Sequence, residues 1–127
     1  MGKIKSYKDL LIWQKGIEIT EKVYLITNNF PQNELFSLTN QIRRASVSIS
    51  SNIAEGFGRN STKSYMNFLK ISRGSLYELE TQLIIADRLN YISDNELLKS
   101  INDLLSEEGK MINSYINKLE LSNVSVN

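Results

Sequence analysis

The sequence predicts an all-α protein, built as an antiparallel up-and-down four-helix bundle. Its 127 residues include 6 Gly and only 1 Pro, too few chain breakers for a protein of many short strands. Apolar residues recur at helical spacing in four long segments, and only a few residues connect one segment to the next. Short connections force consecutive helices to run antiparallel. Because the chain has the usual size of one domain and shows no linker or repeat, we expect a single domain over residues 1–127.

The first helix is predicted over residues 7–29. Its apolar face has spacings of four and three and consists of Ile12, Gly16, Ile19, Val23, Ile26 and Phe30. Ser6, with Asp9 three residues later, resembles an N-terminal capping pair. Pro31 ends the helix, because the residue before a proline is pushed out of the α region.

The second and third helices are predicted over residues 34–57 and 62–89, each with an apolar stripe of its own. Gly56 and Gly58 are expected to end the second helix, since glycine accepts the left-handed conformation typical of helix ends. Asn60 or Ser61 is expected to cap the third helix.

The fourth helix is predicted over residues 93–120. Ser93 and Glu96 have the spacing of a capping box, and Asn90 is a good left-handed stop for the preceding helix. Residues 121–127 have no apolar periodicity, so we expect a frayed tail there.

The chain contains neither histidine nor cysteine, which excludes disulfides, thiolate or imidazole metal ligands, and histidine acid–base chemistry. Glu107 and Glu108 are adjacent on a predicted helix and point in different directions, so they do not form an acid–base couple. We therefore expect no enzymatic activity, no cofactor and no metal. The sequence shows neither a signal peptide nor an apolar run of the roughly 20 residues that a membrane span needs, so a cytoplasmic location is expected.

The net charge of +1 conceals an asymmetry along the chain. Residues 1–73 hold 11 Lys and Arg against 5 Asp and Glu, whereas residues 74–127 hold 4 against 9. Such a division fits a nucleic-acid surface, head-to-tail assembly of identical chains, or pairing between neighbouring helices. The candidate phosphate-binding residues are Arg43, Arg44, Arg59, Lys63, Lys70 and Arg73. Lys3, Lys5 and Lys8 add a basic arm.

A polar stripe runs beside the apolar one on the second helix, and a shorter one follows on the third. Serine and asparagine are poor helix formers, an odd choice for a face that is merely solvated. Small and amide side chains allow helices to approach closely and can fix their register. We therefore predict that these residues lie at an interface between subunits: Gln41, Ser48, Asn52, Glu55, Ser75, Glu78 and Gln82.

Several strings of residues resemble one known family. The second helix carries Gln41-Ile42-Arg43-Arg44-Ala45, Ser48-Ile49 and Asn52-Ile53-Ala54-Glu55-Gly56-Phe57-Gly58-Arg59. These strings closely resemble the signature of the 23S rRNA intervening-sequence protein family, small bacterial four-helix-bundle proteins. Further similarity lies in Tyr7-Lys8-Asp9-Leu10, in Phe30-Pro31 and in Gly74-Ser75-Leu76, and the resemblance covers about residues 7–119. Family members often carry proline where this chain has Ser50, so a weaker kink is expected in the second helix.

The resemblance implies a four-helix bundle and favours a homopentamer. Some members are encoded inside insertions in 23S ribosomal RNA genes. A related branch is the accessory protein of diversity-generating retroelements, which binds nucleic acid and a reverse transcriptase through a basic surface. Two hypotheses follow: a homo-oligomer that associates with RNA or DNA through a basic surface, or a protein-interaction scaffold whose charged faces serve self-assembly only.

Overall fold

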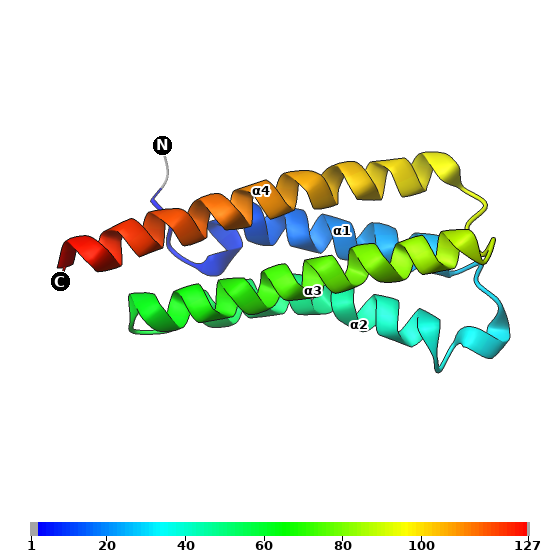
Figure 1. Cartoon of the computed structure of the whole chain (residues 1–127), viewed down its shortest axis with the longest axis horizontal. Helices are drawn as coiled ribbons and strands as arrows, with labels where there is room; N and C mark the ends of the chain where they lie inside the picture. Colours follow the sequence, from blue (N-terminus) through cyan, green and yellow to red (C-terminus); the bar gives the residue numbers. More distant parts are fainter. Residues whose placement is uncertain (1–2, 127) are drawn as a thin grey trace.

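The computed structural model describes residues 3–126 of the chain, with side chains described as far as Ser122. These residues form four α-helices: α1 (Leu11–Thr27), α2 (Leu38–Phe57), α3 (Thr62–Arg88) and α4 (Asn95–Val126). Each helix contacts its neighbours along the chain, and α4 returns to contact α1 (Figure 1). Within the described residues, the backbones of α1 and α3, and those of α2 and α4, are not neighbours. The predicted all-α up-and-down bundle is confirmed.

The core lies along the centre of the bundle and consists mainly of isoleucine and leucine. Every residue of the predicted α1 face is buried, from Ile12 to Phe30. The largest fully buried side chains come from all four helices: Ile12, Ile19, Ile42, Ile49, Ile53, Leu69, Leu76, Leu79, Leu83, Ile101, Leu105 and Ile112. Burial of these side chains, each worth about 1.5–3 kcal/mol, drives the helices together.

The first α-helix begins later than predicted, because residues 7–9 form a separate 3-10 turn. Ser6 and Asp9 do form a capping box, in which the Lys8 backbone N–H donates to Ser6 Oγ at 3.1 Å and the Ser6 N–H donates to Asp9 Oδ2 at 3.2 Å. This box closes a single 3-10 turn, η1 (Tyr7–Asp9). Leu10 then adopts an extended backbone conformation, and α1 starts only at Leu11. The capping motif was identified correctly, but the helix it caps was not.

The second predicted helix also begins later than expected. Pro31 is followed by a 3-10 turn, η2 (Gln32–Glu34), and Ser37 has a non-helical backbone before α2 starts at Leu38. From there α2 runs without interruption to Phe57.

Two glycines near the end of α2 act differently from the prediction. Gly58 has a φ of −79°, and no described glycine has a positive φ, so left-handed termination is wrong here. Gly56 is instead buried between two helices. A Cβ added at Gly56 would lie 2.9 Å from the Phe68 Cβ and 3.0 Å from Tyr65 Cδ1 on α3. The glycine is needed because α2 and α3 approach so closely there.

The caps predicted for α3 are confirmed, whereas the cap predicted for α4 is wrong. Ser61 caps α3 by accepting the Ser64 backbone N–H at 3.1 Å, and Asn90 has a φ of 64°, as a left-handed stop requires. The cap of α4 is Asp94 rather than Ser93, since Asp94 Oδ1 accepts the Leu97 N–H at 3.0 Å.

The frayed tail predicted from residue 121 is not found. α4 continues to Val126, because no proline or glycine interrupts the chain after Leu119, and Asn127 lies outside the described residues. None of the described helices combines the length and the apolar character needed to cross a membrane.

Candidate nucleic-acid interface

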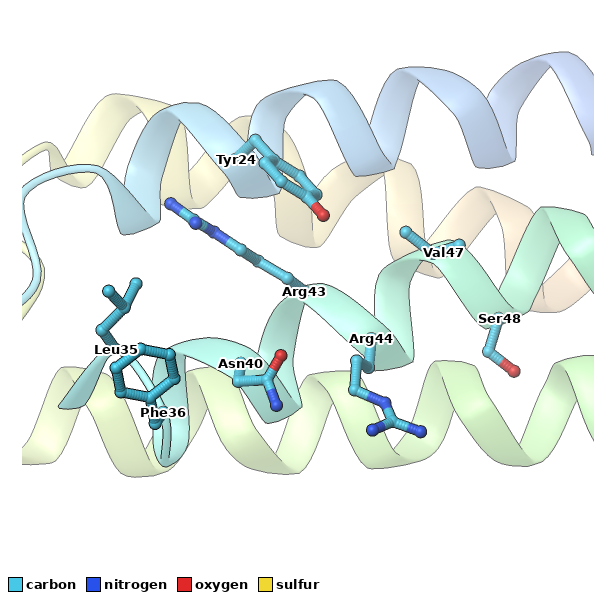
Figure 2. A pocket seen from close by; sticks show the side chains of 8 residues that line it. All are labelled: Tyr24, Leu35, Phe36, Asn40, Arg43, Arg44, Val47 and Ser48. Atoms are coloured by element: carbon cyan, nitrogen blue, oxygen red, sulfur yellow. The ribbon is translucent and has the colours of Figure 1, made fainter.

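Arg43 and Arg44 are adjacent in sequence, but their side chains extend to different sides of α2. The Arg43 guanidinium lies over the Tyr24 ring, 4.7 Å from its centroid, and its Nε donates to Thr27 Oγ1 at 2.9 Å. Arg44 extends to the other side of α2, over α3 in the view of Figure 2. Consecutive helical residues are about 100° apart, which explains the separation. Arg43 is therefore bound to α1, whereas Arg44 is exposed and makes no ion pair with a described side chain.

Arg59 and Lys63 lie at the α2–α3 turn. Arg59 Nη2 pairs with Glu55 Oε2 at 3.1 Å, and its guanidinium lies over the Phe68 ring at 4.6 Å. Lys63 is exposed and has no ion pair within the described part of the chain.

Lys70 and Arg73 face the seam between α3 and α4. Lys70 Nζ lies 4.0 Å from Glu120 Oε1, and Arg73 Nη1 donates to Asn113 Oδ1 at 2.8 Å. Arg73 is half-buried there. Both residues therefore contribute to packing of α4, and Lys70 remains the more accessible of the two.

The six predicted cationic residues do not form one continuous patch. Arg59 follows Arg44 by 15 positions of helix and turn, and a helix of that length spans about 22 Å. The start of the described chain, the α2–α3 turn and the end of α4 lie at the same end of the bundle (Figure 1), and several cationic residues belong to these segments. We call this part of the molecule the basic end; the cationic residues of its segments are Lys3, Lys5 and Lys8 before α1, Arg59 and Lys63 around the α2–α3 turn, and Lys70 in the first half of α3.

The acidic residues near the basic end are already engaged. Glu55 and Glu120 pair with Arg59 and Lys70. Asp9 accepts the backbone N–H groups of Lys5 and Ser6. The lysines of the N-terminal segment and Lys63 thus retain an excess of positive charge.

Part of the predicted polar stripe holds α2 against α3 within one chain. Ser48 Oγ and Ser75 Oγ are 2.8 Å apart, and Asn52 Nδ2 donates to Ser48 O at 2.8 Å and to Ser48 Oγ at 2.9 Å. Ser72, fully buried, donates to Ile49 O at 2.8 Å. Among these stripe residues the Ser48–Ser75 hydrogen bond joins α2 to α3, whereas both Asn52 bonds stay within α2. Whether the same stripe contacts a second subunit stays a prediction.

The other members of the stripe differ in exposure. Gln41 is exposed, and Glu55 is occupied by Arg59. Gln82 is buried, and its Nε2 donates to Glu78 Oε1 at 3.4 Å. Gln41, Glu78 and Gln82 border a shallow hollow between α2 and α3 together with Arg44.

A second hollow, a groove of about 520 Å³, begins at Tyr24 of α1 and crosses the outer side of α2 to Arg44 and Ser48. Figure 2 shows Tyr24 on the α1 side, Leu35 and Phe36 at one end, and Asn40 with the two arginines along α2. Its lining contains no acidic residue. An apolar groove with two cations is suited to a negatively charged ligand that also has a flat or apolar part.

Sequence reasoning missed Glu108, a carboxyl group in the core. Its side chain has no exposed surface, and neither oxygen has a hydrogen-bond partner in the described chain. A Cβ added at Gly16 of α1 would lie 3.3 Å from Glu108 Oε2, so the glycine provides the space for the carboxyl. Burial raises the pKa of Glu108 to about 8, while the charge of Lys15 lowers it. The signal was present in the sequence, because Ile101, Leu105, Glu108 and Ile112 share the spacing of the core stripe.

No group of three or more acidic side chains in the described residues could hold a metal ion. A buried single carboxyl next to one lysine is likewise no catalytic arrangement recognisable from geometry.

Comparison with known proteins identifies the family. The family model for the 23S rRNA-intervening sequence protein matches residues 8–114. The chain belongs to this family. A solved structure of a protein of unknown function from the S23 ribosomal protein family of Bacteroides thetaiotaomicron VPI-5482 is similar to the present member. The two share 27% sequence identity with a TM-score of 0.73, over 84% of this chain and 98% of that one. No curated protein matches this intervening-sequence protein.

Proposed function

We propose that this intervening-sequence protein is a non-enzymatic, self-assembling bundle that associates with RNA or DNA through its basic end. The observation that carries the proposal is the gathering of Lys3, Lys5, Lys8 and Lys63 at one end of the fold, with the nearby carboxylates already paired or hydrogen-bonded. Phosphates respond to charges within about 10 Å at ordinary salt, so this local excess matters more than the net charge of +1. Binding of this kind is weak and largely independent of sequence.

Self-assembly is supported by the outer face of α3. Five large apolar side chains at least two-fifths exposed lie on α3 or at its C-cap, with exposed polar residues such as Glu78 and Thr81 between them: Ile71, Tyr77, Ile84, Ile85 and Leu89. Several exposed apolar side chains on one helix favour contact with another protein surface. The family resemblance favours a homopentamer, and a ring would repeat the basic end and strengthen weak phosphate contacts through avidity.

Charge reversal tests the nucleic-acid part of the proposal. We expect the Lys63→Glu variant to bind structured RNA and duplex DNA several-fold more weakly, with the slope of log affinity against log salt reduced by about 1 per lost contact. Lys99→Glu is the matched control, because Lys99 is a well-exposed lysine near the start of α4, away from the basic end. Its affinity should remain close to that of the wild type.

The competing hypothesis is a protein-interaction scaffold whose charged faces serve assembly only. If the intact oligomer gives no gel shift with structured RNA or duplex DNA at low salt, the scaffold hypothesis replaces nucleic-acid binding. A monomer by light scattering at micromolar concentration would reject self-assembly. A reverse-transcriptase partner and a cytoplasmic location stay predictions of the sequence.

A further inference from the structure

Phe36 is the most exposed large apolar side chain among the described residues. It lies between η2 and α2 and is 92% exposed, whereas its neighbour Leu35 is 37% exposed. Figure 2 shows its ring at the end of the α1–α2 groove, beside Asn40. The same ring also borders the hollow between α2 and α3, so it forms a ridge between two depressions.

The surroundings of this ridge are rich in arginine and amide groups. Arg44 and Asn40 border both depressions, and Gln41 and Gln82 border the second. Arg43 is held in place on the groove side by the Tyr24 ring and Thr27. Glu78, the one acidic residue lining the second depression, accepts the Gln82 amide at 3.4 Å.

We propose that the Phe36 ridge is a stacking site for an unpaired nucleobase of single-stranded RNA or DNA, with Arg44 bound to a flanking phosphate. This inference rests on the proposed function and adds to it a second site, distinct from the basic end, and a preference for single strands. An exposed ring offers its face to any base, and stacking of this kind is a general means of holding single strands.

The chemistry favours a single strand over other occupants. Base faces are covered by their neighbours in a duplex, so a protruding ring has no access to them. The exposed amide groups of Asn40 and Gln41 both donate and accept, as the edges of unpaired bases require. The two arginines, with no acid in the groove, provide charge complementarity to a phosphate chain.

The test compares binding of a fluorescent single-stranded RNA dodecamer with binding of a duplex of the same length. We expect Phe36→Ser and Phe36→Leu to weaken single-strand binding about 5- to 100-fold and to leave duplex binding unchanged. Phe36→Tyr retains the ring and should bind like the wild type. Leu25→Ser is the matched control, because Leu25 is 59% exposed but does not line the groove.

Salt dependence distinguishes the two residues of the site. Arg44→Gln should reduce the salt slope by about 1, whereas Phe36→Ser should lower affinity without changing the slope. In addition, a dodecamer containing 4-thiouridine should form its photo-crosslink within the peptide that carries Phe36, as mapped by mass spectrometry.

Several results would overturn the inference. Unchanged single-strand affinity in Phe36→Ser would do so, as would a crosslink that maps only to the basic end. A change of oligomeric state in that variant with unaltered RNA binding would assign the ridge to a protein contact. If the wild type binds duplex but gains nothing from single strands, this inference fails while the proposed function survives. If the wild type binds neither the single strand nor the duplex, both this inference and the proposed function are rejected.

Discussion

Replacing Glu108 by glutamine should stabilise the protein at neutral pH. The pKa of the buried carboxyl is about 8 in the folded state, against an ordinary value of 4.5 when exposed to water. At pH 7 the folded state therefore holds a proton that the unfolded chain releases. A tenfold change in an acid constant corresponds to about 1.4 kcal/mol, so at pH 7 the cost of keeping Glu108 protonated approaches ~3 kcal/mol. Glutamine has a similar shape and is never ionised, so it avoids this cost.

The sign of the pH dependence follows from the same proton. Because the folded-state pKa is raised, stability falls as pH rises from about 4.5 to about 8. Below this window both states are protonated, and the glutamine variant should match the wild type. We expect the variant to be more stable than the wild type by about 1–3 kcal/mol at pH 7, and by more at pH 8. The gain is smaller than the full cost of protonation because the buried glutamine amide also has no hydrogen-bond partner.

Urea denaturation at pH 4.5, 6, 7 and 8 measures this difference directly. The control is Glu107→Gln, which removes the exposed partner of Lys15, whose Nζ lies 2.7 Å from Glu107 Oε2. A surface pair contributes at most about 1 kcal/mol and has no reason to follow the Glu108 window. A Glu108→Gln effect that is destabilising at pH 7, or the same at pH 4.5 and pH 8, would refute a buried, protonated carboxyl.

Five substitutions test the end of α2, the end of α3 and the start of α4 by thermal or urea unfolding. Gly56→Ala should destabilise the bundle by about 1–3 kcal/mol, because its Cβ would press on Phe68, and an unchanged midpoint would contradict the close α2–α3 approach. Asn90→Ala should cost about 1 kcal/mol through its positive φ while Asn90→Gly should not, and equal effects would show that the backbone angle is irrelevant. Asp94→Ala should cost about 1 kcal/mol and Ser93→Ala far less; the reverse order would return the cap to Ser93.

The helices and their buried faces could be predicted because apolar periodicity is a local property of the sequence. Ile12, Ile19 and Val23 recur at helical spacing, and packing them together needs no information from distant residues. Helix starts were less predictable. Ser6 and Asp9 form the expected capping box, but a box can close a 3-10 turn as well as an α-helix, and only the extended Leu10 decides between them.

The candidate site was less predictable, because each arginine's partner lies far away in sequence. Arg73 is bound to Asn113 on α4, and Lys70 lies near Glu120, so a list of basic residues overstates the charge available to phosphates. Glu108 was missed because the adjacent glutamates Glu107 and Glu108 were considered only as an acid–base couple. Its place in the core stripe and the facing Gly16 become meaningful only when α4 is laid against α1.

The order of helix contacts around the bundle determines which part of the molecule opens most easily. Within the described residues, the backbone neighbours of α4 are α3 and α1, so α4 can separate while the α1–α2 and α2–α3 seams remain intact. Amide hydrogens of α4 should therefore exchange with solvent faster than those of α2. Separation also exposes the carboxyl of Glu108 to water, where it ionises at neutral pH. Opening of the last helix is thus coupled to release of a proton, and its frequency rises as the medium becomes more alkaline.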